Sequence, residues 1–502
     1  MHFACHSGFD LPSFVDQAFA VLKADIGLKS QVTIGDYATT LNYAQTAVPV
    51  QTDETLHLLL PILAQPIVQK IVDASVMGIE TLVIANPQEN SFDTTLKGSI
   101  TNAGPFDAEI SFPEGLTIFW NGQELGSLAM SDVQLTADVG ATIDTAASFA
   151  VSNKDALGAF TKVMLQEESF EWEITGQNLT VNAMGITVPG ISINKTVTLK
   201  GMNGLKNAVT IDTFDLPEDD PAGGITLTLD TTIVNPSQVG IQLNSLAFGS
   251  YYSTGTYLGP VASVPQLSLA PLATSQVKFK GRLVPQTTDA GLADLSKIFT
   301  DFIHDLPSNV EVRGVASDPD ISWLSAGVKT LNVASVLPSR GILDIIKSIS
   351  INQMKMDFPA GSPYSPISSS SDTTAKFDLP FGFALDIVSL EQTILASYQN
   401  TQFAQLALGT IPATTDVTNR IIHLAFQNVP FAVATGAEAT FQTFLAATTT
   451  ADTVTFGLSG TAASQANTSI GRLSISGIAF SVESNMNGLC LIINLDDADR
   501  FS

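Results

Sequence analysis

The chain has 502 residues, enough for about three domains of ordinary size, and only 14% of them are charged while 45% are hydrophobic, which indicates a folded protein. Acidic residues outnumber basic ones by 48 to 22, giving a net charge of −26 with no basic cluster, so we predict no nucleic-acid partner. Two cysteines, Cys5 and Cys490, exclude a disulfide scaffold and a cysteine zinc site.

Residues 1–75 carry no internal repeat and are predicted to form a helical segment. Their longest apolar run, Leu58–Val68, is about half the ~20 residues that a membrane-spanning helix needs, and it contains Pro61 and Pro66. The start of the chain has neither the basic flank nor the apolar stretch of a signal peptide. From the residues alone we expect no membrane anchor and no targeting signal.

The rest of the chain repeats. The tetrapeptide MNGL occurs at Met202–Leu205 and again at Met486–Leu489, 284 positions later (486 − 202), and the same offset relates Gly176 to Gly460. A middle copy is found at half that offset, where "VTIDTFDLP" aligns with "INQMKMDFP" 142 positions further on. Because several matches share each offset, we predict three copies of roughly 130–145 residues.

Each copy consists of short alternating apolar and polar runs that end at Gly, Asn or Pro, as strands do. Turn residues about every ten positions favour a β-sandwich, and one amphipathic helix per copy is expected to cover an edge or an open end. We predict an all-β fold with minor α content, in which the helical segment 1–75 precedes sandwich domains at 76–205, 206–345 and 346–502. The Ser/Pro-rich stretch Ser362–Thr374 is predicted to be a loop of the third copy.

The three predicted helices each carry a bulky apolar face. The simpler interpretation is that these faces close the core of each sandwich. The alternative is that at least one of them leaves an apolar groove for an acyl chain, which would gain about 0.8 kcal/mol for each buried CH₂. The candidate ligand-binding residues are therefore Phe160, Val163 and Met164 in the first copy, Ile298, Phe299 and Phe302 in the second, and Phe441, Phe444 and Leu445 in the third.

Catalytic or metal-binding chemistry has little support in the residues. The five histidines have no metal-ligand spacing, and His304 is interpreted as a partly exposed residue near a helix end. The acidic clusters Asp215–Asp220 and Asp496–Arg500 lack the spacing of a calcium loop and are interpreted as solvated turns. We predict no cofactor, no metal and no catalytic residue. Possible N-glycosylation sites, which a chain rich in Ser and Thr also produces by chance, are Asn178, Asn194 and Asn467.

Four segments carry a resemblance to a known family: "NPSQVGIQLNSLAFGSYYSTGTYLGP", "LKGMNGL", "FDLPEDDPAGGITLTLD" and "GRLVPQT". They resemble uncharacterised fungal membrane-anchored proteins built from tandem type-2 late-embryogenesis-abundant (water-stress and hypersensitive-response) domains. The resemblance covers about residues 60–345 closely and 346–502 more loosely. A yeast vacuolar-membrane protein that acts in terminating autophagy is distantly similar.

This resemblance implies a cytosolic tail, one transmembrane helix and tandem β domains outside the cytosol, with a lipid suspected in a groove between each sandwich and its helix. The sequence departs from the family pattern at its N-terminus, where the anchor is missing. The leading hypothesis is a non-enzymatic lipid-binding or lipid-transfer protein at the lumenal or outer face of a fungal membrane, with the vacuole as the candidate membrane. The alternative is a structural or interaction array with no small ligand, and an enzyme is the third hypothesis.

Overall fold

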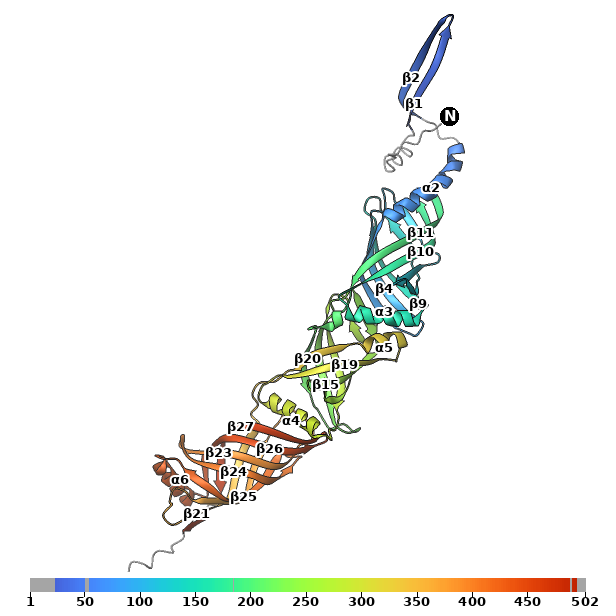
Figure 1. Cartoon of the computed structure of the whole chain (residues 1–502). Coiled ribbons are helices and arrows are strands. Elements are labelled where there is room, and N and C mark those ends of the chain that lie inside the picture. The colour runs from blue at the N-terminus through green and yellow to red at the C-terminus, as the bar shows by residue number, and fades with distance from the viewer. Residues whose placement is uncertain (1–22, 50–53, 184, 488–489, 494–502) are drawn as a thin grey trace, which may run out of the picture.

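The computed structural model describes residues 23–49, 54–183, 185–487 and 490–493. Figure 1 shows an elongated molecule in which three β regions follow one another in chain order. We call residues 76–200 the first β region, residues 209–337 the second and residues 346–493 the third. The chain is mostly β with a few short helices, which confirms the predicted class.

The N-terminal part differs from its prediction. Strands β1 (Lys23–Ile34) and β2 (Tyr37–Pro49) form an antiparallel hairpin, and a helix, α2 (Glu54–Ala74), follows. The helical prediction was therefore wrong for residues 23–49, because alternating β-branched and polar residues flank a two-residue turn that begins at Gly35, whose φ is +63°. Residues 1–22 lie outside the described part. No helix of the described residues is long and apolar enough to cross a membrane.

The first β region is one sheet whose ladder runs β3-β4-β9-β7-β6-β10-β5-β8, with β11 paired to β10. Two strands of the second copy, β14 and β17, extend it, since β14 pairs in parallel with β3. The elements are β3 (Val76–Ala85), β4 (Ser91–Thr101), β5 (Ala108–Ser111), β6 (Leu116–Trp120), β7 (Gln123–Leu128), β8 (Val133–Leu135), β9 (Ala141–Val151), α3 (Lys154–Gln166), β10 (Ser169–Ala183), β11 (Ile186–Lys200), and then the short 3₁₀ helix η1 (Asn203–Leu205).

The second β region is an antiparallel sheet with the order β12-β13-β18-β16-β15-β19-β20. It contains two helices, so the prediction of one helix per copy was wrong here: the seven-residue α5 lies between the last two strands. The elements are β12 (Val209–Asp215), β13 (Ile225–Val234), β14 (Val239–Leu243), β15 (Ser245–Tyr252), β16 (Tyr257–Ser263), β17 (Leu267–Leu269), β18 (Thr274–Leu283), α4 (Asp289–Ile303), β19 (Ser308–Asp318), α5 (Ser322–Val328) and β20 (Asn332–Leu337).

The third β region is a sheet that closes on itself, in the order β22-β25-β24-β23-β26-β27-β21 and back to β22. This region is therefore one closed sheet and not the predicted sandwich of two separate sheets, because β21 pairs with β27 in parallel and with β22 in antiparallel and so closes the ladder. The elements are β21 (Ile346–Phe358), β22 (Ile367–Phe377), β23 (Asp386–Tyr398), β24 (Thr401–Asp416), β25 (Ile421–Val433), α6 (Glu438–Thr450), β26 (Thr453–Thr468), β27 (Gly471–Asn487) and β28 (Cys490–Ile493).

Part of the predicted Ser/Pro loop is the strand β22. Its serines alternate between the two faces, and the buried ones are satisfied inside the sheet: Ser368 Oγ donates to the Val429 carbonyl at 2.9 Å and Ser370 Oγ to the Asn352 carbonyl at 2.8 Å. A serine with a carbonyl partner is compatible with a buried strand face. Composition alone therefore misassigned Ile367–Thr374.

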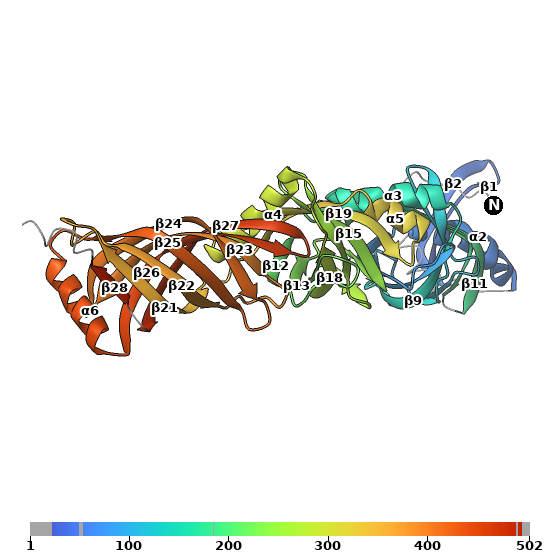
Figure 2. The ribbon, with the colours of Figure 1, turned by 90° about the horizontal axis from the view of Figure 1, so that it is seen from below.

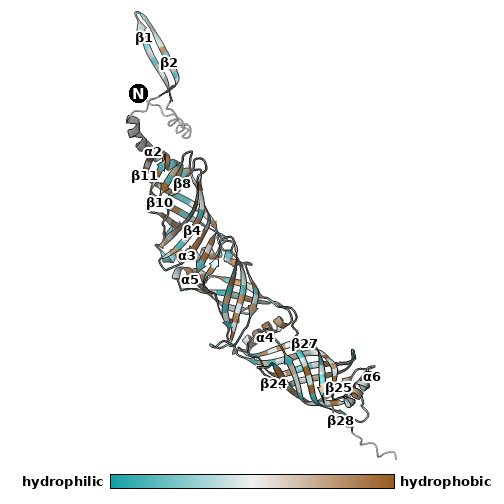
Figure 3. Ribbon diagram, turned by 180° about the vertical axis from the view of Figure 1, so that it is seen from behind, coloured by the Kyte–Doolittle hydropathy of each residue, from teal (hydrophilic) through white to brown (hydrophobic). Residues whose placement is uncertain are grey.

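The repeat is visible in the element order. In each region a helix, α3, α4 or α6, precedes a long strand, β10, β19 or β26, that carries a glycine at Gly176, Gly314 or Gly460. A Cβ added at Gly314 would lie 1.9 Å from the Val328 carbonyl oxygen, so this position excludes a side chain. Along the strands apolar and polar residues alternate, as Figure 3 shows, and along β4, for example, buried positions alternate with more exposed ones.

The apolar cores cross the predicted domain boundaries. One contiguous core extends from Val72 through the first region into Val333 of the second, and another extends from Ile211 to Met486. Helices lie at both junctions: α3 and α5 between the first and second regions, and α4 between the second and third (Figure 2). The division into domains at 205/206 and 345/346 therefore stays a prediction.

Candidate functional site

The apolar face of α3 lies in an aromatic cluster. Asn153 caps the helix by accepting from the Ala156 N–H at 3.0 Å. The Phe160 ring lies 5.0 Å from that of Phe170 and 5.6 Å from Trp172. Met164 is buried and Val163 is half-buried.

The apolar face of α4 meets two regions at once. Ile298, Phe299 and Phe302 are buried, and Phe302 packs 5.2 Å from Phe214 of β12. Phe381, from the connection between β22 and β23 of the third region, lies 4.8 Å from Phe302. Residues from both sides of the 345/346 boundary therefore enclose this face.

The opposite side of α4 is held by the third region. The Ser474 N–H donates to Ser296 Oγ at 3.0 Å, and His304 Nε2 lies 2.9 Å from the Gly477 carbonyl oxygen. Lys297 lies 2.8 Å from the buried Asp301 carboxylate, and that hydrogen bond raises the pKa of Lys297. His304 is the C-cap of α4 and half-buried, as predicted.

The apolar face of α6 carries two phenylalanines that are almost completely buried. Phe441 and Phe444 are 1% and 0% exposed, so they are core residues as well as candidate ligand contacts. The Phe444 ring lies 4.9 Å from Phe403 and 5.4 Å from Phe456. Leu445 is partly buried and packs against the same core.

The structure thus places all nine predicted residues on faces that pack against a sheet, but it does not bring them into one site. The three regions differ in the volume of the apolar cavity that each one contains. The second region encloses a cavity of about 110 Å³, whereas the cavities in the third and first regions are about 50 and 30 Å³. A further cavity of about 70 Å³ lies between α2 and the first sheet.

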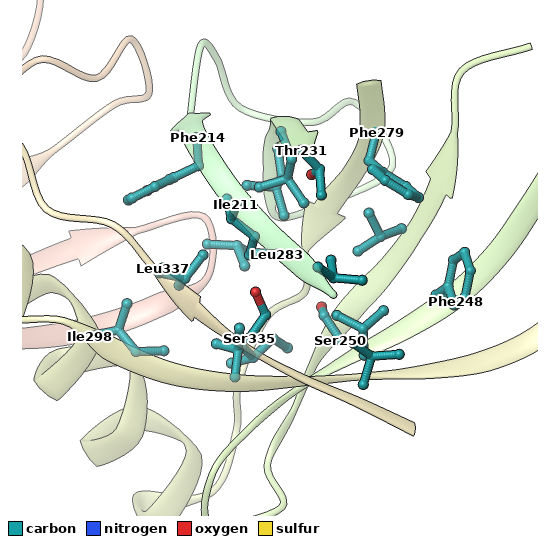
Figure 4. Close-up of a pocket in the computed structure, with 18 of the residues that line it drawn as sticks. Ile211, Phe214, Thr231, Phe248, Ser250, Phe279, Leu283, Ile298, Ser335 and Leu337 are labelled. Atoms are coloured by element: carbon teal, nitrogen blue, oxygen red, sulfur yellow. The ribbon is translucent and has the colours of Figure 1, made fainter. Parts of the chain in front are cut away.

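The cavity of the second region is lined by the sheet and by α4 (Figure 4), and Phe381 of the third region also belongs to its lining. The predicted residues Ile298, Phe299 and Phe302 form its helical wall. Most of its lining comes from strands, and the sequence analysis did not single out those residues. The strand residues include Ile211, Leu227, Leu258, Val261, Phe279 and Leu283.

Three polar side chains, Thr231, Ser250 and Ser335, line this cavity. Ser250 Oγ donates to the Gly259 carbonyl at 2.9 Å. Ser335 is 8% exposed, and within the described part of the chain its hydroxyl has no hydrogen-bond partner. Figure 4 shows the Ser250 and Ser335 hydroxyls among the apolar side chains of the lining. No sequence motif marks Ser335, since Ser is frequent in this chain.

The acidic and Asn-containing motifs lie away from this cavity. Asp219 of the first acidic cluster accepts from Ser469 Oγ at 2.6 Å and from the Ala384 N–H at 3.0 Å, so this turn contacts the third region and is not only solvated. Asp496–Arg500 lies outside the described residues. Asn178 and Asn194 are exposed, and Asn467 is half-buried. In the described ranges, no group of three or more His, Cys, Asp or Glu could hold a metal ion.

Comparisons with known proteins give limited information. A family described as a protein of unknown function (DUF3712) matches residues 123–249, about a quarter of the chain, from β7 through α3 to β15. No curated protein sequence matches. The match spans the junction between the first and second regions.

Solved structures resemble the chain only weakly. A glycosyl hydrolase family 2 member from Bacteroides cellulosilyticus DSM 14838 is 11% identical, with a TM-score of 0.15, over 52% of this chain and 32% of that one. A β-glucuronidase of glycoside hydrolase family 2 is 11% identical, with a TM-score of 0.17, over 54% of this chain and 27% of that one. The partial N-terminal region of an enterococcal surface protein is 7% identical, with a TM-score of 0.11, over 53% of this chain and 94% of that one. The chain spans about a third or less of the two hydrolases, and these scores carry no functional argument.

Proposed function

We propose that the protein binds a lipid or another apolar molecule without converting it chemically. The observation that supports this most is the cavity of about 110 Å³ in the second region, whose wall combines the predicted α4 face with the inner face of the sheet. An apolar cavity of roughly 150 Å³ binds benzene in another protein, so this one has room for a segment of an acyl chain. Longer chains require side chains of the lining to move.

The proposed setting is the lumenal or outer face of a membrane, with the vacuole as the candidate that the resemblance implies. The net charge of −26 opposes direct docking on an anionic lipid surface. A lipid-binding role is therefore proposed for the cavity and not for the outer surface.

Native mass spectrometry of the protein purified from eukaryotic cells tests the proposal. We expect co-purified lipid mass, together with uptake of a fluorescent fatty acid or phospholipid. A clean apo mass without uptake of either probe would count decisively against lipid binding.

A larger side chain that fills the cavity tests whether the bound molecule lies there. Ile211 on β12 and Ile351 on β21 are both buried and line the cavities of the second and third regions. We expect Ile211→Phe to reduce uptake severalfold and the matched variant Ile351→Phe to leave it unchanged. Thermal unfolding of both variants checks that overpacking, which costs about 1–3 kcal/mol, has not unfolded either region.

The second candidate function is a structural or interaction array. It is favoured by the hydrogen-bonded and apolar junctions that join the three β regions, above all the parallel pairing of β14 with β3 and the Asp219 contacts with the third region. An apo protein that keeps these junctions but takes up no lipid would fit this role.

A further inference from the structure

The second and third β regions differ at the place where the first and the last strand of the region meet, which we call the seam. In the third region β21 and β27 pair in parallel, with Ile349–Asn352 opposite Ser484–Asn487. In the second region the corresponding strands, β12 and β20, also lie next to each other, with Cα atoms within 8 Å. Among the described residues, however, no ladder joins them: β12 pairs with β13, and β20 pairs with β19. The second sheet therefore has no backbone ladder at this seam and is open there.

Ser335 and Ser484 occupy equivalent positions at this seam. Ser335 pairs with Val310, four residues before Gly314, and Ser484 pairs with Phe456, four residues before Gly460. In the third region Ser484 Oγ donates to the Ile349 carbonyl at 2.8 Å and so bridges the closed seam. The open seam of the second region leaves the Ser335 hydroxyl without that partner.

The cavity lies beneath the open seam. Both seam strands contribute to its lining, β12 through Ile211 and Phe214 and β20 through Val333 and Ser335. A buried hydroxyl that has lost its water and gained no partner is unfavourable. A buried hydroxyl that faces an apolar cavity therefore indicates a ligand with one polar group.

The first region gives a contrasting case. Its cavity of about 30 Å³ is lined by Thr94 and Trp172, whose buried Oγ1 and Nε1 atoms also have no partner in the described structure. By volume this space holds no more than one or two water molecules, which need about 10–15 Å³ each. Both cavities are lined mostly by apolar side chains, but the cavity under Ser335 is more than three times larger.

The charge of the cavity lining indicates which kind of polar group the ligand carries. The lining of the second cavity contains no Lys, Arg, Asp or Glu, and burying an unpaired carboxylate in such a site is costly. A neutral hydroxyl or carbonyl needs only the hydrogen bond that a serine can donate or accept.

We infer that the second region binds a neutral single-chain amphiphile whose hydroxyl or carbonyl oxygen hydrogen-bonds to Ser335 Oγ, with its hydrocarbon chain between α4 and the sheet. This inference rests on the proposed lipid-binding function. It adds a head-group preference and a residue that determines it.

The test compares three probes of equal chain length, 1-octanol, octanoate at pH 8 and octane, by calorimetry on the full chain. We expect wild type to bind 1-octanol more tightly than octanoate. Ser335→Ala should weaken 1-octanol binding roughly 2- to 12-fold, the range for one net hydrogen bond, and leave octane binding unchanged. The matched control Ser484→Ala should change neither affinity, because that hydroxyl bonds within the third sheet.

The outcomes separate the inference from the proposed function. If Ser335→Ala leaves the ratio of octanol to octane affinity unchanged, or octanoate binds wild type as tightly as 1-octanol, the head-group inference is overturned while lipid binding stands. The head-group inference is also overturned, with lipid binding intact, if Ile211→Phe leaves probe binding unaffected, since the ligand then lies elsewhere. If wild type binds no probe and carries no lipid, the proposed function itself fails.

Discussion

Two glycines allow α3 and α5 to approach each other between the first and second regions. A Cβ added at Gly158 would meet the Ala326 Cβ at 3.4 Å, and one added at Gly327 would meet the Thr161 Cγ2 at 2.5 Å. Thr161 is buried, and its hydroxyl donates to the Leu157 carbonyl at 2.8 Å, so it has little freedom to move aside. The close contact of the two helices therefore depends on the missing side chain at Gly327.

We expect Gly327→Ala to lower the free energy of unfolding by about 1–3 kcal/mol through overpacking, although alanine favours a helix. Gly409→Ala is the matched control, since Gly409 is exposed and an added Cβ there meets no atom within 4 Å. Urea unfolding measures both variants. A gain in stability for Gly327→Ala would show that helix propensity outweighs the contact.

At the scale of elements, a carboxylate of the first region binds the first residue of α5. Glu89, in the turn between β3 and β4, accepts from the Ser322 N–H at 2.7 Å and from the Ser322 hydroxyl at 2.8 Å. Trp323 is buried next to it and donates from Nε1 to the Gln88 carbonyl at 3.0 Å. The Ser322 N–H, followed by its hydroxyl and by Lys154, lowers the pKa of Glu89 below its ordinary value of 4.5.

This pKa shift predicts a pH dependence. Because the folded-state pKa is lowered, the stabilisation by Glu89 is fully present above pH 4.5 and is lost as the pH falls through the folded-state value. We expect Glu89→Gln to be less stable than wild type by about 1 kcal/mol at pH 7, with the difference shrinking toward pH 3. Urea unfolding at several pH values measures it, and the exposed Glu124→Gln serves as control. A difference that stays constant with pH would contradict this role.

At the scale of the whole molecule, the second and third regions are joined by side chains that are distant in sequence. Asp219 accepts from Ser469 and from the Ala384 N–H, the Gly382 N–H donates to the Leu216 carbonyl at 3.0 Å, and Phe381 packs among the phenylalanines of α4. The elongated arrangement in Figure 1 depends at this end on these contacts.

We expect Asp219→Ala to loosen this junction by about 0.5–1.5 kcal/mol. Hydrogen exchange should then become faster at the Gly382 and Ala384 amides and remain unchanged in the first region. Glu218→Ala, at the neighbouring exposed position, is the control. Unchanged protection at both amides in Asp219→Ala would show that the apolar contacts of Phe381 hold the junction without it.

The candidate site was predictable only in part. The spacing of Ile298, Phe299 and Phe302 predicted the helical wall of the cavity, because a helix face is defined by residues three or four positions apart. The strand wall was missed, since every strand of the chain has apolar residues on its inner face. Ser335 was missed because an unpartnered hydroxyl is defined by what surrounds it, and the equivalent Ser484 has a partner.

The sequence by itself determined the all-β class, the repeated order of elements and the helix faces, because alternation and helical spacing are local properties of the chain. The tertiary structure decided whether the first and last strands of each sheet pair with each other. Whether β21 meets β27 in a ladder, or β12 lies beside β20 without one, depends on strands more than a hundred residues apart. It also decided the cavity, because the space left inside a sheet is the small difference between the enclosed volume and all the side chains that fill it.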